Sequence, residues 1–317
     1  MSKSAGNVIA PEEVINKLGA DVLRLWVSAE DYRDDIKISG EILKRLADAY
    51  FRIRNTFRFL LGNLYDFTAE KDRVPYEKLH EVDRWALHRL QKLIGRVREG
   101  YERFEFHIVY HSVQNFCAVE MSALYFDILK DRLYTFRAGS EGRRSAQTAL
   151  DEILRALASL MAPILSFTAE EVWRYLPGGQ GKPESVFLAP FPELRTEYLD
   201  EALNEKWDRI LEIREVVTKA LEEARKRKEI GLSLDAQVHL HLPERTCALI
   251  EPYKDDLKSI FIVSSVTLHE TKDGKEVRAE VLRAEGEKCE RCWNYDPSVG
   301  QHQEHRTICH RCVDAIQ

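Results

Sequence analysis

Apolar residues recur at three- and four-residue spacing up to about residue 228, and this period predicts a series of amphipathic helices. The clearest helix runs from Ser39, a suitable N-cap, to about Leu64. Its apolar stripe is formed by Ile42, Leu46, Ala49, Ile53, Phe57 and Leu60. Further helices are expected after Pro11, from about Asp21, and at about 82–101, 108–132, 144–160, 169–175 and 199–228. Polar connections between these segments favour an antiparallel helix bundle.

After Gly231 the pattern changes to the alternation of polar and apolar residues that is typical of strands. We expect strands at 237–242, 260–268 and 276–282, a helix at 247–258, and a turn at Asp273–Gly274 between the last two strands. The fold class is therefore mainly α: an antiparallel helix bundle, then a small α+β unit, then a C-terminal ribbon. The expected boundaries are 1–38, 39–196, 197–284 and 285–317.

Two Cys-x-x-Cys pairs near the end of the chain predict a metal site. They are Cys289 with Cys292 and Cys309 with Cys312, and 16 residues separate the pairs. This is the ligand set and spacing of a structural zinc ribbon, and four thiolates leave no position open for a substrate. The alternatives are two disulfides, which need an oxidising compartment, or four unrelated cysteines. Three nearby histidines are expected at the surface or around the site: His302, His305 and His310.

Composition restricts the class of partner. The 317 residues are 44% hydrophobic and carry a formal net charge of -6, so a nucleic acid would have to meet a local basic face. The sequence has no apolar run of membrane-spanning length, and no secretory signal is expected at its start. Cys117 and Cys247 lie in helical patterns and are expected to be buried. These features predict a cytoplasmic, reducing setting.

The chain contains no complete set of catalytic groups and no glycine-rich phosphate-binding motif. Its first residues, Met1-Ser2-Lys3-Ser4-Ala5-Gly6-Asn7, place one lysine among small hydroxyl residues. Such a loop could fold over a polyphosphate, where the lysine would stabilise developing negative charge. Without further context these residues favour an ordinary disordered N-terminus over a phosphate-binding loop.

Several longer segments carry a family resemblance. The first residues resemble the Lys-Met-Ser-Lys-Ser signature of class I aminoacyl-tRNA synthetases without its first lysine. More specific segments are GADVLRLW at 19–26, DYRDDIKIS at 31–39, IRNTFRFLLGNL at 53–64, MAPILSFTAEEVW at 161–173 and CERCWNY at 289–295. Together they resemble bacterial isoleucyl-tRNA synthetases over essentially the whole chain. Ala5 stands where leucine is commoner in that family.

The resemblance implies what the first and last parts do. Lys3 would contact the ATP phosphates, with Met1, Ser2 and Ser4 beside it in the ATP-binding loop. ATP and Mg²⁺ would act only in the intact enzyme, isoleucine–tRNA ligase, because the catalytic and editing domains would precede Met1. This chain alone is expected to bind tRNA without aminoacylating it. Residues 1–38 would then be the signature loop and the end of the catalytic region, 39–196 the anticodon-binding bundle, 197–284 a junction domain and 285–317 the zinc ribbon.

The implied partner is the anticodon stem-loop of tRNA(Ile), bound by a monomer. The expected contacts lie on the long helix, at the end of the 199–228 helix and in the ribbon: Arg52, Arg54, Asn55, Arg58, Arg225, Arg227, Arg291, Trp293 and Arg311. Other roles remain open for several of them. Arg225 and Arg227 could complement the helix dipole, Trp293 could pack over the ribbon, and the ribbon arginines could stabilise thiolates. Two rival functions are a free-standing tRNA-binding module acting in trans and a zinc-stapled helical scaffold without RNA.

Overall fold

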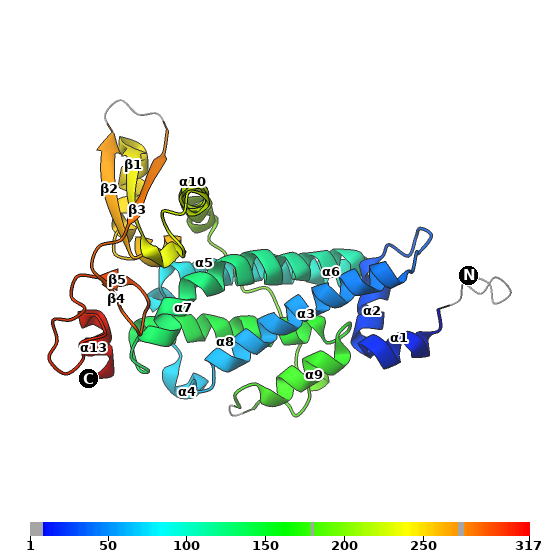
Figure 1. Ribbon diagram of the computed structural model, residues 1–317. Helices are drawn as coiled ribbons and strands as arrows, with labels where there is room; N and C mark the ends of the chain where they lie inside the picture. The colour runs from blue at the N-terminus through cyan, green and yellow to red at the C-terminus, as the bar shows by residue number, and fades with distance from the viewer. Residues whose placement is uncertain (1–8, 179–180, 272–275) are drawn as a thin grey trace. The chain divides into compact units, whose positions relative to one another are not determined.

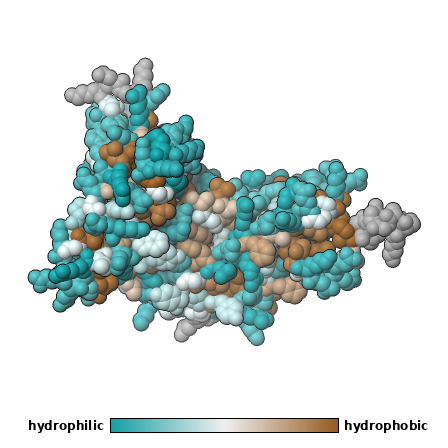
Figure 2. Space-filling model, viewed as in Figure 1, coloured by the Kyte–Doolittle hydropathy of each residue, from teal (hydrophilic) through white to brown (hydrophobic). Residues whose placement is uncertain are grey.

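The computed structural model describes residues 9–178, 181–271 and 276–317, so the ATP-loop predictions at Met1, Ser2, Lys3 and Ser4 lie outside the described residues. The chain forms two compact units, Met1–Tyr125 with Arg144–Asp200, and Phe126–Arg143 with Glu201–Gln317. Within the described ranges no helix combines the length and apolar character needed to cross a bilayer. Hydrophilic side chains predominate on the face shown in Figure 2, and hydrophobic ones form smaller patches.

The first unit is helical (Figure 1). Its elements are α1 (Pro11–Leu18), α2 (Ala20–Ala29), α3 (Gly40–Asn63), α4 (Ala69–Asp72), α5 (Glu81–Glu102), α6 (Phe106–Asn115), the π-helix η3 (Phe116–Tyr125), most of α8 (Glu141–Met161) and α9 (Ser166–Tyr175). The predicted N-cap of the long helix is confirmed, because the Ser39 hydroxyl accepts a hydrogen bond from the Ile42 N–H at 3.2 Å. The helix expected at 108–132 is instead three successive segments, α6, η3 and α7 (Phe126–Thr135).

Helix α8 is the core helix of the first unit, since nearly every residue from Ser145 to Leu160 is buried. Several of its buried polar side chains are hydrogen-bonded. Asp151 accepts from Arg73 and Arg155, and the Ser145 hydroxyl donates to Asp83 at 2.5 Å. Because Arg73 and Asp83 lie on other segments, the polar residues of α8 fix the connections around it as well as filling the core.

Two of the segments that carry the family resemblance pack against each other. Asp21 of α2 is 6% exposed and accepts hydrogen bonds from the Phe167 N–H at 3.3 Å and the Thr168 N–H at 2.7 Å. Its carboxylate also accepts from the Thr168 hydroxyl at 2.6 Å. Arg24, one turn later, donates to the Pro163 and Ile164 carbonyls at 2.6 and 2.8 Å. Asp21 therefore caps the start of α9 from a distant helix, where the orphan N–H groups and the dipole favour a carboxylate.

The second unit combines helices with two small sheets. It contains α7, α10 (Glu201–Lys226), β1 (Ala236–Pro243), α11 (Glu244–Ile250), α12 (Leu257–Phe261), β2 (Ser265–Thr271), β3 (Arg278–Arg283), β4 (Glu287–Lys288), β5 (Tyr295–Asp296) and α13 (His310–Ile316). The larger sheet has the order β2-β1-β3, with β1 parallel to β2 and antiparallel to β3. Alternate residues of β1, including Val238, Leu240 and Leu242, are fully buried on one face.

Three sequence-based expectations in this unit are wrong. The last two strands do not form a hairpin, because β1 lies between β2 and β3. Residues 260–261 belong to α12, and Ile262 follows in a left-handed conformation with φ 59°. The single helix expected at 247–258 is divided into α11, a 3-10 turn at Glu251–Tyr253 and α12. A parallel pair such as β1 and β2 needs a crossover connection, and these helices supply it. The predicted turn at Asp273–Gly274 lies outside the described residues.

Candidate metal centre and nucleic-acid interface

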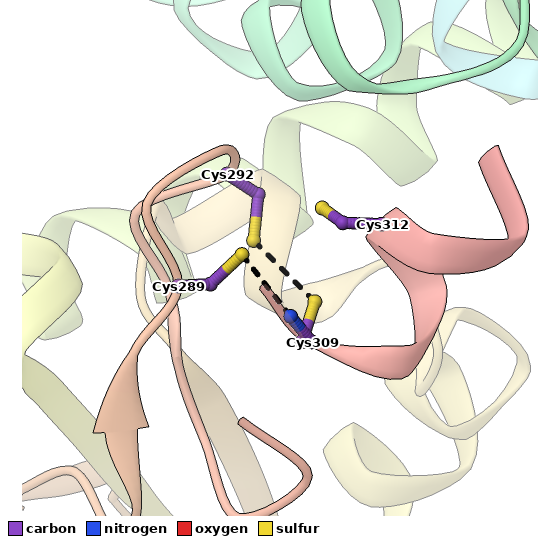
Figure 3. Close-up of side chains that lie close together, drawn as sticks. All are labelled: Cys289, Cys292, Cys309 and Cys312. Atoms are coloured by element: carbon purple, nitrogen blue, oxygen red, sulfur yellow. Dashed lines mark hydrogen bonds between the residues drawn. The ribbon is translucent and has the colours of Figure 1, made fainter. Parts of the chain in front are cut away.

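The four cysteines of the two pairs meet in one cluster (Figure 3). Cys289 and Cys292 lie in the turn between β4 and β5, while Cys309 is the N-cap of α13 and Cys312 lies in its first turn. All four sulfurs lie within 4.8 Å of one another, and the Sγ atoms of Cys292 and Cys309 are 3.8 Å apart. A tetrahedral zinc ion with Zn–S bonds of about 2.3 Å requires sulfur separations of roughly 3.8 Å. The cluster therefore fits zinc, and its cysteines are free thiols with no disulfide among them.

Backbone hydrogen bonds prepare this cluster for a cation. The Cys309 N–H donates to the Cys289 sulfur at 3.3 Å. Burial raises the pKa of the Cys289 thiol, but backbone N–H groups at Cys292, Cys309 and Arg291 outweigh it and lower that pKa to about 7. Burial raises the pKa of Cys309 to about 11. The Cys289 thiol therefore ionises more readily than the Cys309 thiol, and the charge of a bound metal would favour the thiolate form of the ligands.

Each knuckle arginine contacts a cysteine of the other knuckle. Arg291, from the first pair, lies beside the Cys312 thiol and donates to the Thr135 carbonyl. Arg311, from the second pair, lies beside the Cys292 thiol and forms a two-pronged ion pair with Asp131, one N–O distance being 2.8 Å. The two guanidinium groups therefore place positive charge beside the cysteines and attach the ribbon to α7.

Gly286 sets the entry of the chain into the ribbon. It has φ 86°, and a Cβ atom there would lie 2.4 Å from the Asp296 carbonyl carbon. Only glycine permits both this left-handed conformation and this close approach of two backbone segments. The start of the ribbon is thus fixed by backbone geometry before any metal is bound.

Trp293 does not pack over the ribbon core. Its residue is 57% exposed, and the Lys288 ammonium lies 5.4 Å from the centre of its ring. The indole lines a cleft of about 600 Å³ whose other walls include Tyr134 of α7 and Lys258 of α12. Tyr134 is 56% exposed. An exposed indole, a phenol and several cations on one cleft form the kind of surface on which unstacked bases can stack.

The polar residues predicted on α3 divide into two groups. Arg52, Asn55 and Arg58 are exposed on one stripe of the helix. Arg54 is turned toward α9, where it forms an ion pair with Glu171 at 2.8 Å. That hydrogen-bonded carboxylate raises the pKa of Arg54. The exposed stripe also carries Phe51, which is 56% exposed.

Both arginines predicted at the end of α10 contact the loop that follows the helix. Arg225 donates to the Gly231 carbonyl at 3.2 Å and to the Ser233 hydroxyl at 3.1 Å. Arg227 pairs with Glu229 at 2.8 Å, and this hydrogen bond raises the pKa of Arg227. These contacts give both arginines a structural role in the loop, and both side chains remain exposed.

The cleft residues on α7 and α12 were missed from the sequence. Lys130 and Tyr134 lie more than a hundred residues before Trp293 in the chain, and Lys258 lies 35 residues before it. No local motif marks them, since their helices are predicted from apolar spacing alone. Only the fold of the second unit brings them to the ribbon.

Comparisons with known proteins agree with this geometry. Residues 83–240 match the family described as anticodon-binding domain of tRNA ligase, residues 286–315 match the zinc finger found in FPG and IleRS, and residues 1–39 match tRNA synthetases class I (I, L, M and V). The zinc-finger match and the clustered cysteines confirm the predicted structural Zn²⁺ site.

Curated relatives match over the whole chain. The isoleucine–tRNA ligases of Syntrophotalea carbinolica, Geobacter sulfurreducens and Moorella thermoacetica are 56%, 53% and 51% identical over 324, 325 and 330 residues. Each alignment covers 100% of this chain and 35% of the relative, so the chain spans about a third of the length of these ligases. The chain therefore belongs to the bacterial isoleucine–tRNA ligase family of class I tRNA synthetases, of which it carries an anticodon-binding region and a zinc finger.

Proposed function

We propose that this chain binds the anticodon stem-loop of an isoleucine tRNA, and that in the intact enzyme it positions this tRNA for ATP-dependent attachment of isoleucine. The observation that carries the proposal is the exposed indole of Trp293 in a cleft with Tyr134 and Lys258. The match of residues 83–240 to anticodon-binding domains supports the same partner. The function of the zinc is then indirect: it holds the turn that presents Trp293.

Each part of the proposed interface has a distinct task. Trp293 and Tyr134 offer flat faces on which loop bases stack, and Lys258 supplies charge for a neighbouring phosphate. Arg52 and Arg58, exposed on α3, would meet stem phosphates, and Asn55 can donate to a phosphate or sugar oxygen. Because the net charge of the chain is -6, these local cations must outweigh general repulsion of the RNA.

Replacement of Trp293 by alanine tests the proposal. Loss of one stacked base costs about 1–3 kcal/mol, so the Kd for an isoleucine tRNA should rise roughly 5- to 150-fold. Trp293→Phe keeps a ring and should retain most of the affinity. The measurement is filter binding at fixed salt with the isoleucine tRNA and a valine tRNA as competitor.

Tyr175→Ala is the matched control, because Tyr175 is 75% exposed on α9 and lies outside the cleft. It should leave the Kd unchanged, and zinc content should be equal in all variants. Equal affinity for both tRNAs would contradict recognition of isoleucine tRNA. Absence of any tRNA binding at low salt would favour the scaffold function instead.

The chain alone is proposed to be inactive in adenylate formation. Purified protein should give no isoleucine-dependent ATP–pyrophosphate exchange, since the described residues offer no complete set of catalytic groups. A robust exchange signal would overturn this part of the proposal without affecting the tRNA-binding part.

A further inference from the structure

Three histidines lie together on the open face of the larger sheet in the second unit. His239 and His241 are two residues apart on β1, so their side chains project from the same face. In the strand register His269 of β2 is the partner of His241, and Glu280 of β3 is the partner of His239. Three adjacent strands therefore contribute three imidazoles and one carboxylate to one surface.

The side chains are in direct contact. His239 Nδ1 and His269 Nε2 are 2.8 Å apart, with their rings inclined by 12°. The ring centres of His241 and His269 are 4.8 Å apart at 17°, and His241 Nε2 lies 3.9 Å from a Glu280 oxygen. All three histidines are partly exposed, so a dissolved ion can reach them.

A neighbouring glutamine determines which ring nitrogen of His239 carries the proton when that ring is neutral. The Gln237 amide nitrogen, which can only donate, lies 3.3 Å from His239 Nε2. His239 Nε2 is then the acceptor, so a neutral His239 carries its proton on Nδ1 and donates it to His269 Nε2. A nitrogen lone pair of His269 is thus already directed at the ring of His239.

We propose that His239, His241, His269 and Glu280 form a second metal site, distinct from the cysteine cluster, for a divalent late transition-metal ion such as Zn²⁺ or Ni²⁺. Imidazole nitrogen is a preferred donor for these ions, and a carboxylate completes a four-ligand set. The ion takes the place of the hydrogen bond between His239 and His269. His239 then carries its proton on Nε2, and the Gln237 amide turns to accept it through its oxygen.

The movement required of the His239–His269 pair is small. Two nitrogens that share a tetrahedral ion at about 2.0–2.1 Å lie roughly 3.3 Å apart, so the observed pair must open by about 0.5 Å. Within the residues the structure describes, the four cysteines are the one group whose donor atoms are already arranged for a metal. The histidine site forms by side-chain rotation, and Arg278, the β3 partner of His241, opposes a cation there. The histidine site therefore binds a metal ion more weakly than the cysteine cluster does, and the bound ion clamps β2 and β3 to β1.

Calorimetric titration of the zinc-loaded chain with NiCl₂ at pH 7.5 tests the site. One ion should bind per chain without release of zinc from the ribbon. His239→Gln and His269→Gln should each raise the Kd for Ni²⁺ at least tenfold, and Glu280→Gln should raise it less. Full-strength Ni²⁺ binding in the His239→Gln/His269→Gln double variant would overturn the proposal.

The ribbon supplies a matched control. His302 and His305 also form a stacked pair, with ring centres 5.3 Å apart, but no third histidine contacts them in the described structure. Replacement of His302 and His305 by glutamine should leave the Kd for Ni²⁺ unchanged. Loss of Ni²⁺ binding in these variants would mean that the ion binds to the ribbon and not to the sheet. A second measurement needs no variant: Ni²⁺ should protect His239, His241 and His269, but not exposed His310, from diethyl pyrocarbonate. Equal modification with and without Ni²⁺ would contradict the site.

Discussion

The two knuckle arginines show how single residues make a metal site part of the fold. Arg291 contacts Cys312 and Arg311 contacts Cys292, so each cation joins the two halves of the cluster before any ion binds. Arg311 also pairs with Asp131, whose burial would raise its pKa; the hydrogen bond from Arg311 reverses this and lowers the pKa. A lysine at either position could not reach two partners with one planar group. The sequence placed these arginines symmetrically, but it could not reveal that each one crosses to the other pair.

Removal of one thiolate should release the zinc and unfold only the ribbon. In Cys289→Ser the tetrahedral set loses the ligand with the lowered pKa, so zinc content should fall from one per chain to a small fraction. Limited proteolysis should then cut within residues 285–317 while the helices of the first unit stay protected. Zinc content is measured by mass spectrometry and protection by fragment mass.

Cys247→Ser is the matched control for this prediction. Cys247 lies on α11, is partly exposed and is not a member of the four-cysteine group. It should keep one zinc per chain. Retention of zinc and of a protected ribbon in Cys289→Ser would mean that Cys289 is not a ligand.

At the scale of elements, the contact between α2 and α9 depends on one buried carboxylate. Asp21→Ala removes three hydrogen bonds and leaves two N–H groups at the start of α9 without their acceptor. The free energy of unfolding of the first unit should fall by about 2 kcal/mol, the upper end of measured losses for a helix N-cap. Urea unfolding followed by circular dichroism measures it.

The matched variant is Asp35→Ala, because Asp35 is exposed and outside any helix. It should change the free energy of unfolding by less than about 0.5 kcal/mol. Asp21→Asn keeps one acceptor oxygen, so its free energy of unfolding should lie between those of Asp21→Ala and Asp35→Ala. If Asp21→Ala unfolds at the same urea concentration as Asp35→Ala, the cap is not a stabilising contact.

The same elements show what the sequence could and could not predict. Helices with a long apolar period, such as α3 and α10, were predicted to within two or three residues, because burial of one stripe imposes the 3.6-residue period. The order of the strands in the sheet was not predicted, because a parallel strand pair depends on a crossover connection and not on a local turn. The π-helix η3 was also missed, since its ten residues carry no distinct hydrophobic period. The four cysteines were predicted in full, because ligand spacing is a local property.

For the molecule as a whole, the proposed recognition of RNA must rest on a few cations against a net charge of -6. A cation that replaces counterions at one phosphate changes the slope of log Kd against log salt by about 0.7–0.9. A cation already held by a carboxylate contributes little to this slope. The ion-pair state of each arginine in the structure therefore predicts its contribution to the salt dependence of binding.

Arg52 and Arg54 make this prediction testable within one helix. Arg52 is exposed, whereas Arg54 is paired with Glu171. Under the proposed interface, Arg52→Ala should reduce the salt slope for isoleucine tRNA by about one unit, because it removes one phosphate contact. Arg54→Ala should leave the slope unchanged even if it lowers stability, because its charge is already neutralised by α9. The measurement is Kd from 50 to 300 mM KCl for both variants; an equal loss of slope in the two would show that the Arg54–Glu171 pair opens on RNA, and no loss in either would remove α3 from the interface.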